Sequence, residues 1–494
     1  MKYVSTRNPA VAVTASQAIT KGISADGGLF VPDAIPAVST AEIAALAQMD
    51  YIGRARTILS MYLTDFTAEE VDRCVHGAYD SGFSDPKIAP TVPVGDGVAI
   101  LELFKGPTCA FKDMALQMLP HLLTVASDKA APGTEIVILV ATSGDTGKAA
   151  LEGFKDVPNT RILVFYPSDG VSPMQKLQMC TQEGANVGVS AIYGNFDDAQ
   201  TGVKKIFTDP EIAAKLAANG MAFSSANSIN WGRLAPQIVY YFSAYCDLIN
   251  QGTVRCGEPI NIVVPTGNFG NILAAYYAKR MGLPVQRLVC ASNSNSVLTE
   301  FLTTGVYDRN REFFTTISPS MDILISSNLE RLLYAVSGSE KVKGWMQALS
   351  ETGRYQIDDA AFAEISALFS AGCCNDDETK ATIARLFKDK GYLCDTHTAV
   401  AVKVYEDYRA RTGDATPTVI ASTASPFKFS AAVLEAVGGS DDALDEFGMV
   451  ERLAAVTGKP CPAPLAGLRD KAVRFDGCCE KEGMEQVVFD LLGI

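Results

Sequence analysis

Six short apolar segments, most of them followed by a turn and a helical pattern, constrain the fold of this chain more than any other feature. Short, fully apolar strands that alternate with helices are typical of parallel sheets covered by helices on both faces. We therefore predict an α/β fold with two doubly wound, mainly parallel sheets. The expected strands are Glu135–Ala141, Arg161–Tyr166, Asn186–Ile192, Asn261–Pro265, Arg287–Ala291 and Thr418–Ser422.

The regions outside these strands indicate further parts. Residues 1 to about 95 form a separate N-terminal section, in which Thr67-Ala68-Glu69-Glu70 has the spacing of a helix capping box. Three prolines between Ser84 and Gly97 indicate a linker. A helical section is expected from about Leu329 to Tyr408.

Charge and composition exclude several classes of function. The chain has 494 residues, enough for two or three domains, and its formal net charge is −14. An acidic balance disfavours nucleic acid and anionic membrane surfaces as partners. No signal-peptide pattern or membrane-length apolar run is present, and the 12 cysteines have no CxxC spacing. We expect a cytoplasmic protein with reduced thiols, and with only three histidines we expect no metal site.

One lysine, Lys112, stands out because it follows the turn at Gly106-Pro107 and begins an apolar helix. One interpretation is a surface cation whose stem is buried. The other is a desolvated amine with a lowered pKa that can form a Schiff base. This stretch alone leaves both interpretations open.

Two loops lie where parallel sheets bind ligands, at the carboxyl ends of strands. The loop Thr266–Asn271 opens a helix and can hold a phosphate through backbone amides, or it is an ordinary turn. The loop Thr142–Gly147 offers hydroxyl groups and amides that suit a carboxylate, or it is a capped turn. Neither loop has the Walker A or GxGxxG pattern, so a nucleotide kinase or a Rossmann dehydrogenase fits poorly.

Two further stretches carry polar groups. The segment Ser225–Arg233 is rich in neutral donors and ends in an arginine, a combination that can position a phosphate or that is a polar loop before a helix. Thr423, just after the last expected strand, can meet a pyridine nitrogen without protonating it, or it can cap a helix.

The identity and order of these motifs resemble the threonine synthase family, pyridoxal-phosphate enzymes of fold type II. The resemblance covers nearly the whole chain. Its motifs are Tyr3–Arg7, Asp26–Leu29, Gly106–Thr108 with Phe111–Asp113, Ser143–Gly147, Asn227–Asn230 with Arg233, Thr266–Asn271 and Ser326–Arg331.

The resemblance implies the conversion of O-phospho-L-homoserine and water to L-threonine and phosphate. Lys112 matches the Schiff-base lysine, the loop of Gly267, Asn268, Phe269, Gly270 and Asn271 matches the cofactor-phosphate loop, and Thr423 matches the hydroxyl at the pyridine nitrogen. Substrate-binding residues are expected in four further groups: Lys105; Thr142, Ser143, Gly144, Asp145 and Thr146; Asn227, Ser228 and Asn230; and Arg233.

Two positions depart from the pattern of the family. Many members have histidine where this chain has Lys105 and Ser425. Lys105 can still serve a phosphate as a point charge, whereas Ser425 removes a proton-shuttle role at its position. His397 is either a site residue or a satisfied structural histidine.

The resemblance predicts three domains and a monomer or homodimer. The domains are an N-terminal domain, 1–95, a smaller movable α/β domain, 96–230, which has Lys112 near its start, and a larger α/β domain, 231–494. Two alternatives remain. The chain is another fold-type-II lyase, such as a serine or threonine dehydratase, or a non-catalytic member that binds phosphoesters.

Overall fold

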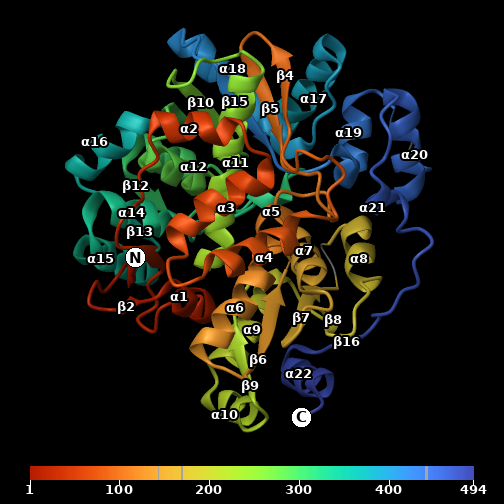
Figure 1. The fold of residues 1–494 in the computed structure, drawn as a ribbon. Coiled ribbons are helices and arrows are strands. Elements are labelled where there is room, and N and C mark those ends of the chain that lie inside the picture. Colours follow the sequence, from red (N-terminus) through yellow and green to blue (C-terminus); the bar gives the residue numbers. More distant parts are fainter. Residues whose placement is uncertain (143, 169–170, 440–442) are drawn as a thin grey trace.

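The computed structural model describes residues 1–142, 144–168, 171–439 and 443–494. Two helix-covered sheets dominate it, the larger in the upper part of Figure 1 and the smaller in the lower part. All strand pairs in both sheets are parallel except the one at the edge of the larger sheet. The predicted fold class, α/β with two doubly wound, mainly parallel sheets and an additional N-terminal part, is confirmed.

The smaller sheet has five strands in the order β16-β8-β7-β6-β9. Its three central strands are the predicted ones, and their side chains are almost all buried because helices cover both faces. The two edge strands are short and were not predicted. The strands are β6 (Glu135–Ala141), β7 (Thr160–Pro167), β8 (Val187–Ile192), β9 (Met221–Ser224) and β16 (Cys478–Cys479). The accompanying helices are α6 (Leu119–Ala130), α7 (Asp145–Phe154), α8 (Pro173–Cys180), α9 (Phe196–Thr208), α10 (Pro210–Ala218) and α22 (Met484–Leu492).

The larger sheet has six strands in the order β14-β11-β10-β15-β5-β4. The linker predicted between Ser84 and Gly97 is wrong over Thr91–Gly95, which forms the antiparallel edge strand β4. Pro93 is compatible with this strand because an edge strand has one side without ladder hydrogen bonds. The other strands are β5 (Val98–Glu102), β10 (Ile260–Pro265), β11 (Val285–Ser292), β14 (Phe369–Cys373) and β15 (Thr418–Ser422).

The N-terminal part combines a small antiparallel sheet, in the order β2-β1-β3, with four helices. The capping box predicted at Thr67 is present, with Glu70 as its partner. Tyr3 packs against Trp231, which begins the central helix. The elements are β1 (Tyr3–Ser5), β2 (Ala12–Val13), β3 (Phe30–Pro32), α1 (Ala15–Lys21), α2 (Thr40–Ala47), α3 (Tyr51–Tyr62) and α4 (Ala68–Tyr79).

Helix α11 (Trp231–Asn250) is buried along nearly its whole length and packs against α2, α3, the short α5 (Asp113–Leu116) and α12 (Gly270–Met281). A helix that is buried on all sides is part of a core. It therefore joins the N-terminal part to the larger sheet and holds Arg233 in its first turn.

The remaining elements surround the larger sheet. The predicted helical section from Leu329 to Tyr408 exists, but β14 and a short strand, β13 (Arg354–Gln356), interrupt it. The other elements are α13 (Val297–Thr304), β12 (Val306–Asp308), α14 (Leu329–Ser337), α15 (Ser339–Thr352), α16 (Asp359–Leu368), α17 (Asp376–Lys390), α18 (Thr396–Thr412), α19 (Ser430–Ala436), α20 (Glu446–Thr457) and α21 (Ala463–Ala466), with 3-10 helices at Pro319–Met321, Pro426–Phe429 and Lys481–Gly483.

Strand pairing crosses the predicted domain limits. Strands β4 and β5 (Thr91–Glu102) belong to the larger sheet, and β16 joins the smaller sheet from the far end of the chain. The three-domain division remains a prediction. In the described part of the chain, no helix combines the length and the apolar character that crossing a membrane requires.

Candidate active site

The segment that carries Lys112 lies beside the end of β15. The Phe111 N–H donates to Thr423 O at 2.8 Å, and the Ser425 N–H donates to Cys109 O at 3.0 Å. The buried carboxylate of Asp113 closes the preceding turn by accepting from the Thr108 N–H at 2.8 Å and the Thr108 hydroxyl at 2.6 Å. These bonds place Lys112 at the carboxyl end of the larger sheet.

The amine of Lys112 lies between the two sheets. Its Nζ is 3.4 Å from Ser320 Oγ and 3.7 Å from Asp145 Oδ2. Burial lowers its pKa to about 8, and the nearby cations Lys428 and Arg233 act in the same direction, while Asp145 opposes them. An amine with such a pKa is partly neutral near physiological pH, so it can act as a nucleophile or a base.

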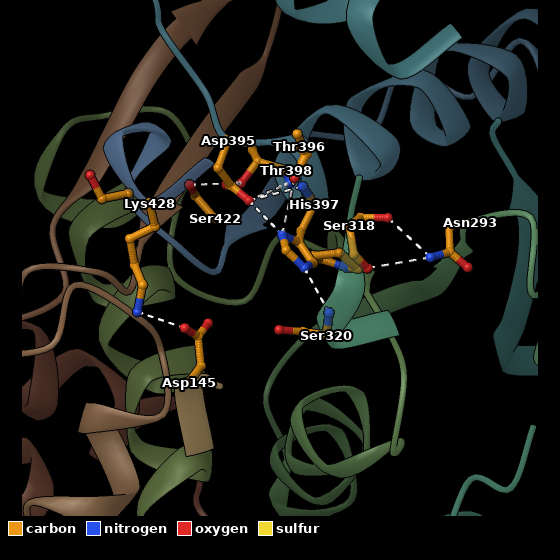
Figure 2. Close-up of polar contacts among 12 residues, drawn as sticks. Asp145, Asn293, Ser318, Ser320, Asp395, Thr396, His397, Thr398, Ser422 and Lys428 are labelled. Atoms are coloured by element: carbon orange, nitrogen blue, oxygen red, sulfur yellow. Dashed lines mark hydrogen bonds and ion pairs between the residues drawn. The ribbon is translucent and has the colours of Figure 1, made fainter. Parts of the chain in front are cut away.

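Asp145 bridges Lys112 and a second lysine, Lys428, whose Nζ is 2.7 Å from Asp145 Oδ1 (Figure 2). Lys428 is fully buried and also donates to Thr108 O at 3.0 Å, while Gln175 donates to Asp145. Burial alone would raise the pKa of Asp145, but the two lysines outweigh it and hold that pKa well below its usual range. Asp145 therefore stays ionised.

Lys428 was missed by the sequence analysis. Like Lys112, it follows an aromatic residue, Phe427, and it comes just after the carboxyl end of a strand. That pattern, shared with Lys112, was the sequence signal that could have identified Lys428 as a site residue. Thr423, which was predicted, lies in the same segment and is buried.

The loop after β6 is organised by Thr142. Its hydroxyl accepts from the Gly144 N–H and the Gly147 N–H, both at 3.0 Å. Gly144 has φ +152°, and a Cβ there would lie 2.5 Å from the Gln175 side chain, so the position requires glycine. Asp145 and Thr146 begin α7. The predicted residue Ser143 lies outside the described residues.

The loop after β10 presents backbone amides at the start of α12. Among the described residues, no protein acceptor takes the N–H groups of Gly267, Asn268, Phe269, Gly270 or Asn271. Phe269 has φ +63°, an uncommon conformation for a side-chain-bearing residue that marks functional sites. Consecutive unpaired amides at a helix start form an anion-binding concavity. The loop thus fits a phosphate group.

Neighbouring segments hold this loop in place. Ser326 Oγ donates to Gly267 O at 2.8 Å, and the Asn328 N–H and Nδ2 both donate to Asn268 O at 3.1 Å. Arg331, fully buried, donates to Asn328, to Phe30 O in β3 and to Ile229 O. The motif Ser326–Arg331 therefore ties the loop to the N-terminal part.

Arg233 is a buried cation near Lys112. It donates to Ala226 O at 2.9 Å, and in the described chain no carboxylate lies within ion-pair distance of its guanidinium. Burial lowers its pKa to about 10, so it remains charged at neutral pH. A buried, unpaired guanidinium is costly unless an anion joins it.

The other predicted substrate residues differ in their surroundings. The side-chain amide of Asn230 donates to Ile19 O and Ser225 O, and its oxygen accepts from the Gly232 N–H, which leaves it no donor for a ligand. Asn227 is exposed and Ser228 is half-buried. Lys105 pairs with Glu102 at 2.8 Å.

The site has no metal-binding character in the described residues, where no group of three or more His, Cys, Asp and Glu side chains could hold an ion. It offers instead a buried amine, an anion-binding loop and an unpaired arginine. Such a site on a two-sheet α/β fold defines a pyridoxal-phosphate-dependent enzyme, and the model described as "Pyridoxal-phosphate dependent enzyme" matches residues 94–373.

Comparisons with known proteins narrow the class. The models described as "Threonine synthase N terminus" and "Threonine synthase, C-terminal" match residues 2–79 and 398–488. The chain belongs to the threonine synthase family, and pyridoxal phosphate is its cofactor.

Individual relatives agree with this assignment. The chain is 37% identical to threonine synthase of Pseudomonas aeruginosa over 90% of this chain and 92% of that protein. It is 41% identical to human Threonine synthase-like 1 over 85% of this chain, and the matched region spans 58% of that longer protein. The pyridoxal-phosphate-bound threonine synthase structure from Brucella melitensis superposes with a TM-score of 0.89 at 38% identity, covering 99% of both chains.

Proposed function

We propose that this chain is a threonine synthase, which converts O-phospho-L-homoserine and water to L-threonine and phosphate. The observation that carries the proposal is that Lys112 lies among features suited to two separate anions. Unpaired amides at Gly267–Asn271 suit one phosphate, and the buried guanidinium of Arg233 suits a second anion. A cofactor phosphate and a substrate phosphate require two such receptors.

The residues that would hold the cofactor are those that the family resemblance indicated. Lys112 supplies the covalent attachment, and the amides of Gly267, Asn268, Phe269, Gly270 and Asn271 receive the phosphate. The close approach of Ser320 O, 2.7 Å from where a Cβ on Gly267 would lie, supports a tight loop that only glycine allows. Thr423 would meet the ring nitrogen with a neutral hydroxyl.

The substrate would lie on the side of the smaller sheet. The loop Thr142–Thr146, Ser143 among its residues, would receive its carboxylate, with the hydroxyl of Thr142 already used to shape the loop. Arg233 and Lys105 would attract its phosphate. Asn227 and Ser228 would border it. Since its amide is already occupied, Asn230 would position helix α11 and not bind substrate directly.

Local charge favours a dianionic substrate. Lys112, Lys428 and Arg233 are balanced by Asp145, which stays ionised, and in part by Asp113, whose pKa burial raises to about 6. Bound pyridoxal phosphate supplies the electron sink for a carbanion at the substrate. The Nζ of Lys112 would move protons, first at Cα and then at Cβ, because its lowered pKa allows it to give and take them near neutral pH.

The domain division and the setting of the protein are also part of the proposal. A part within residues 96–230 that carries the Thr142–Thr146 loop would close over the substrate and exclude water until the addition step. Hydrogen exchange in that loop should slow with a substrate analogue, and unchanged exchange would argue against closure.

Twelve free thiols in the described chain support a cytoplasmic protein. Light scattering would distinguish a monomer from a homodimer.

The test uses purified protein supplied with O-phospho-L-homoserine. Wild-type protein should release phosphate and threonine in equal amounts, and Lys112→Ala should release neither. Release of a 2-oxo acid from serine or threonine, without activity on O-phospho-L-homoserine, would identify the dehydratase alternative. Cofactor binding without turnover of any of these substrates would identify a binding protein.

A further inference from the structure

A buried Asp395–His397 pair lies behind the active-site lysine and has no part in the mechanism above. The two side chains lie at the start of α18, with exposed fractions of 0% and 3%, and His397 Nδ1 is 2.9 Å from Asp395 Oδ1 (Figure 2). On the other side of the ring, Nε2 receives the backbone N–H of Ser320 at 3.1 Å. The hydroxyl of the same Ser320 is the 3.4 Å partner of Lys112 Nζ.

These partners determine the tautomer of the imidazole. A backbone N–H can only donate, so Nε2 must offer a lone pair to Ser320. The carboxylate of Asp395 can only accept, so Nδ1 carries the hydrogen. The two hydrogen bonds thereby orient the ring of His397 at both nitrogens.

Helix capping alone does not explain the pair. Asp395 caps α18 by accepting from the His397 N–H at 2.9 Å and the Thr398 N–H at 3.4 Å, and its second oxygen accepts from the Thr398 hydroxyl. Those bonds need no imidazole at position 397. Among the described residues, Nε2 has one hydrogen bond, which leads away from the helix to Ser320.

Ser320 lies on a short 3-10 helix, Pro319–Met321, that is held from two sides. Asn293 Nδ2 donates to Ser318 Oγ at 3.0 Å and to Asp322 Oδ1 at 2.7 Å, which fixes the turn on the side of β11. His397 fixes it on the side of α18. The carbonyl of Ser320 also packs against Gly267 in the cofactor-phosphate loop. One residue thus contacts both the lysine and the loop.

We propose that Asp395 and His397 are positioning residues that hold Ser320 against Lys112 and so direct the amine toward the cofactor aldehyde. The proposal rests on the proposed cofactor role of Lys112, and it assigns to the Ser320 hydroxyl a direct contact with the reacting nitrogen.

The test compares two substitutions that divide the functions of the imidazole. In His397→Gln, the side-chain oxygen reaches about as far as Nε2 and can still accept from Ser320. In His397→Asn, the shorter amide can still donate to Asp395 but does not reach Ser320. The measurement is the rate at which cofactor-free protein captures pyridoxal phosphate, trapped by borohydride reduction, with no substrate present. We expect His397→Gln to stay within about threefold of wild type and His397→Asn to fall at least about tenfold.

A double-substitution cycle sharpens the test. Ser320→Ala should slow capture by about as much as His397→Asn does. The double variant His397→Asn/Ser320→Ala should be no slower than Ser320→Ala alone, because both substitutions interrupt the same path of contacts from His397 through Ser320 to Lys112. Equal effects of Gln and Asn at position 397, or fully additive losses in the combined variant, would show that the pair only supports folding. Thermal midpoints of all variants report the purely structural part.

A matched control is available on α4, where His76 Nδ1 contacts Asp80 at 2.8 Å on the exposed surface. His76→Gln and His76→Asn should leave capture unchanged. Capture is measured without substrate, so it tests this inference separately from the proposed function. Wild-type protein that captures the cofactor but releases no threonine would contradict the proposed function, and the comparison of the His397 variants would still test the positioning role.

Discussion

The two sides of the site are built from different kinds of interaction. On the side of the larger sheet, the loop Thr266–Asn271 is held by neutral hydroxyl and amide groups, with Arg331 donating to backbone carbonyls behind it. On the side of the smaller sheet, Asp145 is held between Lys112 and Lys428. Neutral bonds keep their strength when protons move, whereas a shared carboxylate responds to every change of charge on its partners. The side of the larger sheet is therefore suited to a group that stays bound throughout, and the side of the smaller sheet to a ligand whose charge changes during a reaction.

The largest test of this comparison removes the charge of Asp145. Asp145→Asn leaves the fully buried Lys428 without a counter-ion, and loss of one partner of a buried pair costs about 3–5 kcal/mol of unfolding free energy. Urea denaturation would measure it. Adding Lys428→Met should restore much of the loss, because it removes the fully buried cation that has lost its nearest counter-ion. A double variant no more stable than the single one would contradict the charge-based account.

The next test addresses the side of the larger sheet. Arg331→Met leaves the carbonyls of Phe30 and Ile229 without their buried donor, and we expect a loss of about 3 kcal/mol together with weaker cofactor binding. The control is Arg385→Met, which breaks a half-exposed pair with Glu406 and should cost less than about 1 kcal/mol. Similar losses in both variants would show that Arg331 has no special supporting role.

A smaller effect is expected from one added methyl group. In Gly267→Ala, the Cβ would lie 2.7 Å from Ser320 O, so the loop must shift, and we expect a cost of about 1–3 kcal/mol and at least about tenfold weaker cofactor binding. Gly344→Ala is the matched control, since no atom lies within 4 Å of its Cβ and it sits within α15. There alanine should add about 0.5–1 kcal/mol of stability. Spectrophotometric titration with cofactor would separate the two.

The last test concerns protons and needs no change in the stability of the fold. Burial holds the pKa of Lys112 at about 8, below its ordinary value of 10.5, so lowering the pH below 8 converts the amine to ammonium. Cofactor capture by cofactor-free protein should slow about tenfold for each unit below that pKa and level off above it. In Asp145→Asn the midpoint should move to lower pH, because the carboxylate that favours the ammonium is gone. A midpoint near 10.5 would contradict a desolvated lysine.

Most of the fold followed from the sequence because parallel strands are apolar runs of recognisable length. The six predicted strands exist. Strand β5 was missed although Val98–Leu101 is an apolar run, and other strands were missed where that signal weakens. The apolar pattern of strand β14 is interrupted by Ser370 and Gly372, and β4 contains Pro93. The two-residue β16 is too short to carry any period.

The site was less predictable because its contacts join distant parts of the chain. Lys112 stood out through its neighbours, but Lys428 was missed because a lysine is ordinarily a surface residue and its partner Asp145 is far away in sequence. The sequence left the role of His397 open. Its imidazole accepts a hydrogen bond from the backbone N–H of Ser320, and a backbone group leaves no trace in the sequence. The individual roles at the site stay predictions.

The contact between the Lys112 segment and the segment after β15 also has a temporal consequence. Lys428 and Thr108 are 320 residues apart in the chain. At about 5–20 residues per second, a ribosome needs roughly 15–60 seconds to make the interval between them. For that time the surroundings that lower the pKa of Lys112 are incomplete, because Lys428 is one of the cations beside it. The buried cluster of Lys112, Asp145 and Lys428 therefore forms only after most of the chain has been made.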